Sequence, residues 1–507
     1  FKKAHLVLKM LPERNAVAWT ALIAGYVQHE CWVEALNCFQ QMELEGVTPD
    51  VITWVCVLQA CGSSGDIGKG SEIHATIERK ALLESNLVLG TNLVDMYAKC
   101  GMLVKACQVL YKLSVPDAAS WNALISGYVQ YEYNEEALDC SDLMQSQGLS
   151  LNHVTFACTL KACCNIGDML RGQEIHAEIA RKGVLNSSDF VDNALIDLYA
   201  KCSSFAKAKE VFDMLEVKST ISWNALISGC VQNDCGEEAL RCFEEMQVKG
   251  VSPDDITISC ILKACGRMGI IEKGEQIHAD IESKGLVESN VMVGTALLDM
   301  YAKCGMLEKA REVLEELPTR NVVSWNALIS GYTQQGHGYE ALSCFEKMQD
   351  DGLFPDDGTF QCVLCACGHS GLLDEAWILF EDMNSSCDVI VPNIEHRTCM
   401  IMVFGYAGRF DEAISVIEAM PSLDDGAVWL ALLATCRKWA NVEIGRLAFD
   451  QTLQLDESCG AAYVLMANIF ATLGMQEDVD SVEAMRLKYA TTTCWDELGK
   501  IMLGQCE

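Results

Sequence analysis

A chain of 507 residues is long enough for several globular domains, and half of its residues are hydrophobic. No apolar run approaches the length of a membrane span, which predicts a soluble chain without a membrane partner. The 27 cysteines follow no secretory signal and recur at helical core positions, which indicates small buried hydrophobes in a reducing compartment rather than disulfides. The formal net charge of −34 argues, at first sight, against a protein that binds phosphates through Lys and Arg.

A repeat of 102 residues organises the chain. A near copy of WNALISGY begins at Trp19, Trp121, Trp223 and Trp325. In the last copy, Leu328, Ile329 and Tyr332 follow the tryptophan at i+3, i+4 and i+7, the spacing of one buried helical stripe. Val323 and Asn326 fall on a second, less apolar face of the same helix.

Each 102-residue unit divides into three helical hairpins of 35, 36 and 31 residues, which in the third unit are 220–254, 255–290 and 291–321. Gly250 is placed to stop the second helix of the first hairpin, and Asp254 is placed to cap the next helix. A hairpin of this size cannot bury its apolar face alone, so stacked neighbours must supply the core. The pattern therefore predicts an all-α fold, a right-handed superhelical α-solenoid of helix-turn-helix repeats.

In chain order, residues 1–15 match the tail of a short hairpin and include no initiator methionine or targeting segment, so we expect the N-terminus to be missing, which says nothing about the protein's address. The order long, longer, short then runs four times over residues 16–425. Residues 426–493 contain two further hairpins of a different pattern, and residues 494–507 form a tail with no strong pattern.

The combination of WNALISGY, KAC, IHA, MYAKCG and the 35/36/31 spacing resembles plant pentatricopeptide-repeat (PPR) proteins. The resemblance is to the class with alternating P, L and S motifs followed by E1 and E2 motifs, here at 426–493, and without a deaminase domain in this chain. Members of this family bind single-stranded organellar RNA, and most known ones of this class specify C-to-U editing sites. The resemblance implies the same function and an organellar address, with the mitochondrion favoured over the chloroplast.

In such repeats two or three side chains of each hairpin read one base. The resemblance assigns this role to the fifth and the last residue of each hairpin. In the P-type hairpins these pairs are Thr20 with Asp50, Asn122 with Asn152, Asn224 with Asp254, and Asn326 with Asp356. In the S-type hairpins they are Thr91 with Asp117, Asn193 with Ser219, Thr295 with Asn321, and Thr398 with Asp425. The L-type hairpins carry Val55, Ala157, Ser259 and Gln361 at the fifth place and are left unassigned. The implied RNA is 5′-GnGYnCUnAUnG-3′.

Two of these assignments have ordinary structural alternatives. Threonine and asparagine are poor helix formers, so helix propensity does not explain the fifth residue, but Asp or Asn before a helix is a common N-cap. Both roles can coexist at the last residue. The resemblance also implies that Val17, Ala119, Ile221 and Val323 flank the bases, for which the alternative is ordinary packing between repeats.

The distribution of charge matters more than its sum. The first helices of the P-type hairpins, residues 16–28, 118–131, 220–233 and 322–335, contain no Asp, Glu, Lys or Arg. The acidic residues fall on second helices, as in Glu237 and Glu238. We therefore expect a neutral groove and an acidic outer face, and such a face is usually only solvated.

Catalysis is not expected of this chain. His176-Ala177-Glu178 matches the first half of a zinc-deaminase signature, but His74 and His278 hold the equivalent places without the glutamate, and no proline is followed by cysteine. Cys362, Cys365 and Cys367 lack a second ligand pair for zinc. We expect no metal, no cofactor and no small-molecule substrate.

The predicted function is to specify an editing site for a deaminase-bearing PPR protein, or another editing factor, acting in trans. The alternatives are an RNA stability or splicing factor and a protein-binding scaffold of the tetratricopeptide type.

Overall fold

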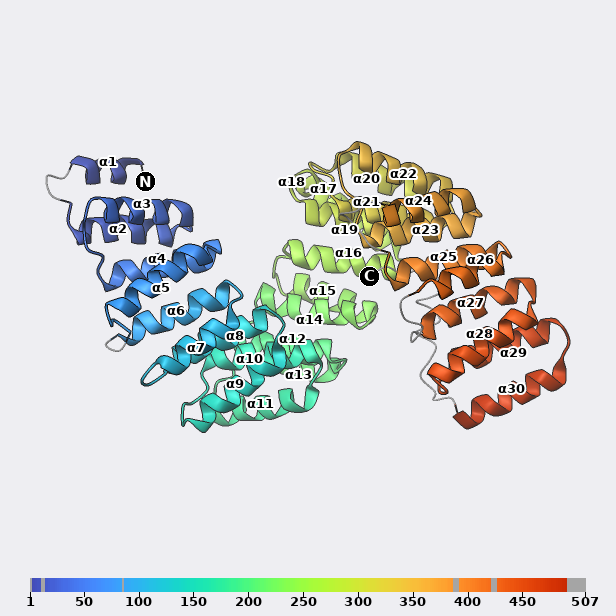
Figure 1. The fold of residues 1–507 in the computed structure, drawn as a ribbon, viewed down its shortest axis with the longest axis horizontal. Helices are drawn as coiled ribbons and strands as arrows, with labels where there is room; N and C mark the ends of the chain where they lie inside the picture. The colour runs from blue at the N-terminus through green and yellow to red at the C-terminus, as the bar shows by residue number, and fades with distance from the viewer. Residues whose placement is uncertain (1, 11–13, 84–85, 386–391, 421–425, 490–507) are drawn as a thin grey trace. The chain divides into compact units, whose positions relative to one another are not determined.

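The structure is a computed structural model that describes residues 2–10, 14–83, 86–385, 392–420 and 426–489. Two compact units, Phe1–Ser252 and Pro253–Glu507, make up the chain. All regular elements of the described residues are α-helices, and in each unit they form hairpins that stack on one another (Figure 1). The predicted all-α solenoid is therefore confirmed. Within the same described ranges, no helix combines the length and the hydropathy that crossing a membrane requires.

In the first unit, helix α1 (Lys2–Met10) is followed by seven hairpins. Their first helices are α2 (Ala16–Gln28), α4 (Val51–Ser64), α6 (Leu87–Lys99), α8 (Ala118–Gln130), α10 (His153–Ile166), α12 (Asp189–Lys201) and α14 (Thr220–Gln232). Their second helices are α3 (Trp32–Leu44), α5 (Ile67–Arg79), α7 (Leu103–Lys112), α9 (Asn134–Ser146), α11 (Met169–Lys182), α13 (Phe205–Met214) and α15 (Gly236–Val248).

The second unit has the same plan. Its first helices are α16 (Asp255–Met268), α19 (Val291–Lys303), α21 (Val322–Gln334), α23 (Asp357–Ser370), α25 (Ile394–Tyr406), α27 (Gly426–Trp439) and α29 (Gly460–Thr472). Its second helices are α17 (Ile271–Ser283), α20 (Leu307–Glu316), α22 (Gly338–Asp350), α24 (Leu373–Ser385), α26 (Phe410–Glu418), α28 (Val442–Leu455) and α30 (Gln476–Tyr489). A short α18 (Leu286–Ser289) lies between α17 and α19.

The hydrophobic stripe predicted from the 102-residue repeat forms the core. Trp325, Leu328, Ile329 and Tyr332 are all buried on α21. First helices pack against the first helices of neighbouring hairpins, as α6 does against α4 and α8. Residues at one register position therefore lie on neighbouring helices, and this arrangement positions the candidate site.

Close helix approach explains one glycine of the repeated motif. A Cβ atom at Gly229 on α14 would lie 2.1 Å from the Cβ atom of Ala200 on α12. Gly127 and Gly331 meet Ala98 and Ala302 in the same way, at 2.6 and 2.7 Å. The glycine of WNALISGY thus packs against the alanine of the preceding YAKC segment.

The described cysteines behave as the composition predicts. Burial raises the pKa of the Cys61, Cys163 and Cys436 thiols to about 12. A thiol with such a pKa stays protonated at neutral pH and packs as a small hydrophobe. The sulfur atoms of Cys365 and Cys399 lie 3.3 Å apart.

Candidate nucleic-acid interface

The fifth residue of each P-type hairpin lies in the second turn of a first helix and is held firmly. Thr20, Asn122 and Asn224 are buried, and Asn326 is half-buried. A polar side chain in such a place must find partners within the protein or in a ligand, because an unpaired buried polar group is costly.

At the last P-type hairpin the partners form a closed network. Asn326 donates from Nδ2 to Oδ1 of Asp356 at 2.9 Å, and its Oδ1 accepts from the Thr359 hydroxyl at 2.7 Å. The same Oδ1 of Asp356 accepts from the backbone N–H of Thr359 at 2.8 Å, which makes Asp356 the N-cap of α23. The network fixes the orientation of the Asn326 amide.

The same arrangement recurs in the first unit. Asn122 donates to Asn152 at 3.1 Å and accepts from Thr155 at 2.6 Å. Thr20 lies 3.5 Å from Oδ1 of Asp50, and the hydroxyl oxygens of Thr20 and Thr53 are 2.6 Å apart. The structure therefore brings the fifth and last residues together in these pairs.

For the third P-type hairpin, Asn224 and Asp254 belong to different units, and Asp254 caps α16 in a capping box with Thr257. The threonine three residues after each last residue was missed as a partner of the fifth residue. The capping-box spacing was its available signal. These four residues, all with fully buried side chains, are Thr53, Thr155, Thr257 and Thr359.

The network leaves one polar group of the last residue for a ligand. Among the described residues, every hydrogen bond of the Asp356 carboxylate uses Oδ1, so Oδ2 remains as an acceptor. Within the same residues, every hydrogen bond of the Asn152 side chain also uses Oδ1, so Nδ2 remains as a donor. Capping and ligand recognition are thus compatible at one residue, and Asp and Asn present opposite groups.

The protonation state of Asp356 supports this distinction. Burial raises the pKa of its carboxyl group, but hydrogen bonds from Thr359 and Asn326 outweigh burial and hold the pKa below its usual range. The group is therefore an ionised acceptor at neutral pH.

The S-type pairs differ from the P-type pairs. The hydroxyls of Thr91 and Thr295 are buried and have no hydrogen-bond partner within the described residues, and the same holds for Ser259 in an L-type hairpin. An unpaired buried hydroxyl costs about 1–3 kcal/mol, which a hydrogen bond to a ligand would offset. Asp117 and Asn321 act as N-caps of α8 and α21. The sequence analysis left Ser259 unassigned, together with the other fifth residues of the L-type hairpins.

The remaining S-type residues have different surroundings. Asn193 and Ser219 line one small cavity. The hydroxyl of Thr398 donates to the backbone oxygen of Ile394 at 2.8 Å, one turn earlier in the same helix. Asp425 lies outside the described residues.

The apolar residues assigned to flank the bases are exposed. Val17, Ile221 and Val323 are 71%, 64% and 62% exposed, and Ala119 is exposed as well, so burial between repeats is wrong as their explanation. The same place in other hairpins holds further exposed apolar side chains that were missed: Ile52, Val88, Val154, Phe190, Ile256 and Met292. Each is the second residue of its hairpin and lies in the first turn of a first helix.

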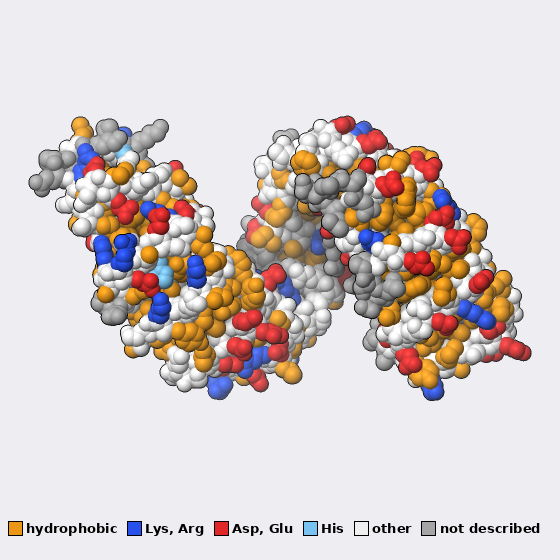
Figure 2. Space-filling view, in the orientation of Figure 1, with side chains coloured by type: hydrophobic (Ala, Val, Ile, Leu, Met, Phe, Trp, Pro, Cys, Tyr) orange, Lys and Arg blue, Asp and Glu red, His pale blue; other side chains and the backbone are white. Residues whose placement is uncertain are grey.

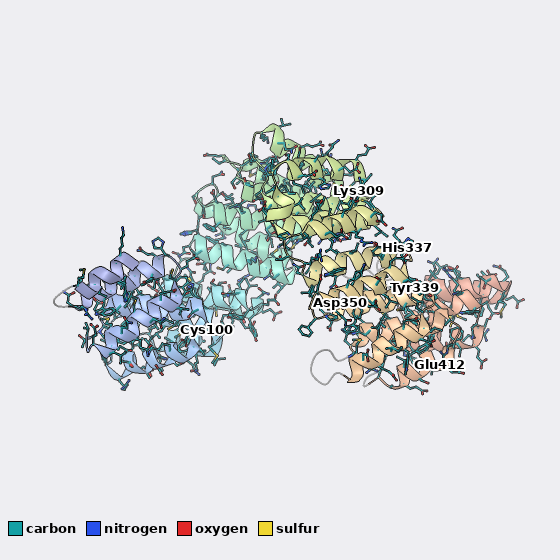
Figure 3. The ribbon with its side chains drawn as sticks, turned by 90° about the horizontal axis from the view of Figure 1, so that it is seen from above. Cys100, Lys309, His337, Tyr339, Asp350 and Glu412 are labelled. Carbon is teal, nitrogen blue, oxygen red and sulfur yellow. The ribbon has the colours of Figure 1, made fainter. Side chains whose placement is uncertain are left out.

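Charge on the first helices is sparse, and part of it is paired within the same helix. Lys99, Lys201 and Lys303 form ion pairs with Asp95, Asp197 and Asp299 one turn earlier. Lys161 and Lys263 are exposed and have no ion pair among the described residues. Each follows the fifth residue of its L-type hairpin by four positions and so shares its face. The sequence analysis did not single out these two cations. Other charged side chains, such as Lys309, Asp350 and Glu412, belong to second helices (Figure 3).

The residues that resembled a catalytic motif have a packing role. His176 lies 2.8 Å from the Tyr199 hydroxyl, and His74 and His278 make the same contact with Tyr97 and Tyr301. These bonds join an L-type second helix to the next S-type first helix. Cys362, Cys365 and Cys367 are buried on α23, and the described part of the chain contains no group of three or more side chains that could hold a metal ion.

Fold and site together define a helical-repeat protein with a polar pair and an exposed apolar residue in successive hairpins. The model of the PPR repeat family matches residues 14–63, 116–165, 218–267 and 320–369. A PPR repeat model matches 193–219, 295–322, 358–387 and 396–424, and an E motif model matches 439–490.

Curated relatives agree. A chloroplastic pentatricopeptide repeat-containing protein of Arabidopsis thaliana is 34% identical over 92% of this chain and 54% of its own length. A mitochondrial one is 32% identical over 93% of this chain and 84% of its own length. The chain therefore belongs to the pentatricopeptide-repeat proteins, with an E motif, as its sequence resemblance predicts. It spans about half of the first relative.

A solved structure shows the same fold. The crystal structure of the PPR protein PPR10 from maize matches with a TM-score of 0.55 and 18% identity, over 94% of this chain and 75% of that chain.

Proposed function

We propose that this protein binds single-stranded organellar RNA, one base per hairpin, and thereby specifies a C-to-U editing site for a deaminase acting in trans. The observation that carries the proposal is the repeated polar pair, which is fixed by an internal threonine and keeps one donor or acceptor for a ligand. The exposed apolar residues beside the pairs offer surfaces on which bases can pack.

The reading residues of this proposal are those given above: the fifth and last residues of the P-type and S-type hairpins, with Val17, Ala119, Ile221 and Val323 beside the bases. The division into a repeat array at 16–425 and an E1/E2 region at 426–493 is part of it. The E motif match at 439–490 supports a role in editing with a deaminase-bearing PPR protein. Relatives named chloroplastic and mitochondrial support an organellar location, and we favour the mitochondrion.

The implied target gives the direct test. Gel-shift titration should show tighter binding to 5′-GnGYnCUnAUnG-3′ than to a scrambled RNA of the same composition. Equal affinity for the two RNAs would contradict base reading, and no binding to either at low salt would favour the protein scaffold. An RNA stability or splicing role would use the same interface and would leave editing unchanged when the gene is disrupted.

Salt dependence should be shallow. If Lys161 and Lys263 are the unpaired cations that meet phosphates, two contacts imply a slope of about −1.4 for single-stranded RNA, or about a sevenfold loss between 50 and 200 mM salt. Proteins that make 6–10 phosphate contacts lose about a thousandfold or more. The Lys161→Gln/Lys263→Gln double variant should flatten the slope further, whereas Lys347→Gln on the second helix α22 should not. A steep slope in both variants would place the phosphate contacts elsewhere.

Asp356 offers a way to separate capping from reading. In Asp356→Asn the Oδ1 cap is kept, so thermal stability should hardly change, because Asn and Asp are equally good N-caps. The free acceptor becomes a donor, which should shift preference at one base from U, with its N3–H donor, toward C, with its N3 acceptor. Fluorescence titration with RNAs that differ at that base measures the change. Asp350→Asn removes the same charge on α22 and is the control. Unchanged affinity for both RNAs would make Asp356 a cap only.

A further inference from the structure

A P-type, an L-type and an S-type hairpin in succession make one triplet, and in three of the four triplets the second helix of the L-type hairpin carries a cation at one register position. Lys69 and Arg171 occupy one register position, 102 residues apart, and Lys273 follows them in the third triplet. Lys69 pairs with Glu43 on the preceding second helix at 3.6 Å, and Arg171 pairs with Asp142. These triplets therefore neutralise the junction internally.

The fourth triplet reverses the charge at this position. Glu375 on α24 replaces the cation, and Glu346 lies on the facing helix α22. Both are exposed, and neither has an ion pair among the described residues. Asp382 extends the acidic rim by two turns along α24. The fourth triplet thus leaves Glu346 and Glu375 without the cation that pairs across this junction in the first two triplets.

Three surface positions become apolar in the same triplet. Phe354, Trp377 and Ile378 are 78%, 42% and 58% exposed. Polar residues hold the equivalent places in the earlier triplets: Thr48, Ser150 and Ser252; Ser71, Gln173 and Glu275; Glu72, Glu174 and Gln276. Since the helices are the same, folding does not require these changes. Exposed aromatic and aliphatic side chains that gather at one place are typical of an interaction site.

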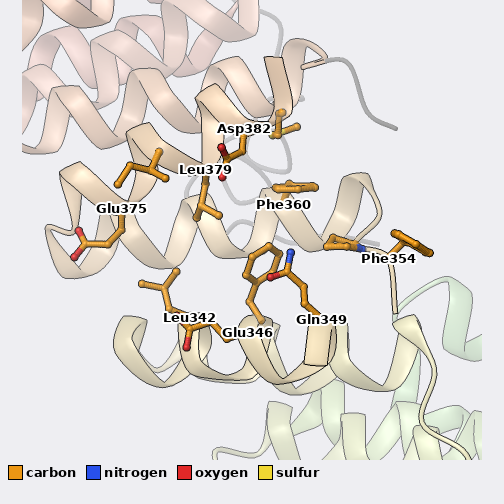
Figure 4. Close-up of a pocket in the computed structure, with 12 residues that line it drawn as sticks. Leu342, Glu346, Gln349, Phe354, Phe360, Glu375, Leu379 and Asp382 are labelled. Atoms are coloured by element: carbon orange, nitrogen blue, oxygen red, sulfur yellow. The ribbon is translucent and has the colours of Figure 1, made fainter. Parts of the chain in front are cut away.

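Glu375, Phe354 and Ile378 line a cavity of about 490 Å³ between α22 and α24 (Figure 4), whereas the Trp377 ring lies near those of Phe380 and Phe404. Leu342, Glu346 and Gln349 line one wall at helical spacing, Glu375, Leu379 and Asp382 line the other, and Phe360 lies between them. In the space-filling view, apolar side chains gather over α22 and α24 with acidic side chains among them (Figure 2). Two walls that each run for about two helical turns fit another helix lying along them.

We propose that this groove docks an amphipathic helix of a protein partner, with apolar side chains entering the cavity and a Lys or Arg lying between Glu346 and Glu375. The partner's cation would take the place of the internal cation of the earlier triplets. RNA does not fit the site, because the acidic rim repels phosphate. The groove walls are second helices, whereas the base-reading residues lie on first helices, so the inference does not depend on RNA binding.

A helical peptide of Leu and Lys of about 18 residues, long enough to populate the helix, is the probe. Fluorescence anisotropy should show that Glu375→Lys, which restores the charge of the earlier triplets, weakens peptide binding by about tenfold or more, as should Phe354→Ser. Glu381→Lys makes the same charge change on α24 outside the cavity and should alter binding by less than about twofold. Thermal melting confirms that all three variants fold.

Three outcomes would overturn the proposal. Equal losses in Glu375→Lys and Glu381→Lys, or equal binding of a peptide in which Ser replaces Leu, would indicate attraction to an acidic surface only. Self-association that Glu375→Lys abolishes would make a second copy of the chain the occupant. RNA titration of the same variants keeps the two proposals apart, since neither variant should change RNA affinity.

Discussion

Trp223→Ala is expected to destabilise its unit by about 3–5 kcal/mol, the usual loss for a large aromatic side chain removed from a core. Trp223 has no exposed surface, and its ring packs edge-on against Phe212 with the ring centroids 4.4 Å apart. Lys209 and Lys249 lie over the ring at 5.7 and 5.4 Å from its centroid. Removing the ring therefore leaves a cavity in the core beside α14, the helix that also carries Asn224. Urea unfolding followed by circular dichroism measures the loss.

Trp223→Phe is the informative control. The indole Nε1 of Trp223 is buried without a hydrogen-bond partner among the described residues, so the N–H group contributes nothing that phenylalanine would lose. We expect this variant to lose less than about half of what alanine loses. A repeat protein can also open locally, so limited proteolysis between α13 and α15 should report the same order. An equal loss of unfolding free energy in the two variants would contradict this expectation, because it would mean that the indole N–H group makes a stabilising hydrogen bond.

The core was predictable because burial in a solenoid follows the repeat. Trp325, Leu328 and Ile329 share one face in any helix that begins near residue 322, and neighbouring hairpins of the same pattern must cover that face. The N-caps were equally accessible, since Asp356 precedes an apolar helix by one residue. For the buried residues and the N-caps, the local sequence pattern and the packing of repeats agree.

The network around the reading pairs was not predictable in the same way. Thr359 follows Asp356 closely in the sequence, but its bond to Asn326 spans 33 residues and depends on how two hairpins stack. The repeat places Ser259 at a fifth position but does not distinguish it from the other L-type residues there, because its distinction is an unpaired hydroxyl that only the surrounding packing reveals. Side-chain partners across repeats depend on the separation and rotation of helices, which periodicity does not specify.

The acidic groove was only partly predictable from the sequence. The sequence alone shows that Glu375 reverses the charge of Lys273. Only the structure shows that Glu375 lines a cavity between α22 and α24. Replacement of a cation by a carboxylate at one repeat is unremarkable on a solvated face. It becomes a site when Phe354 and Ile378 open an apolar surface beside it.

Asn326→Ala is expected to weaken binding of the matched RNA by about 5- to 150-fold, the equivalent of about 1–3 kcal/mol for a good base contact. The loss should be confined to RNA that carries U at the tenth position of 5′-GnGYnCUnAUnG-3′. Hydrogen bonds to Asp356 and Thr359 hold the Asn326 amide in one orientation before RNA binds. Binding therefore loses little side-chain entropy at this residue. The Thr359 hydroxyl still reaches Oδ1 of Asp356 at 2.8 Å without Asn326, so α23 keeps its cap.

Titrations of wild type and Asn326→Ala against the U-containing RNA and an RNA with A at that position measure the effect. Wild type should prefer U, and the variant should bind the two RNAs almost equally, close to the affinity of wild type for the mismatched RNA. Asn92→Ala removes the same side chain from a first helix and should leave affinity unchanged. Among the described residues, the one side-chain hydrogen bond of Asn92 goes to the backbone oxygen of Val88. A uniform loss for both RNAs in Asn326→Ala would mean that the residue supports the groove without reading a base.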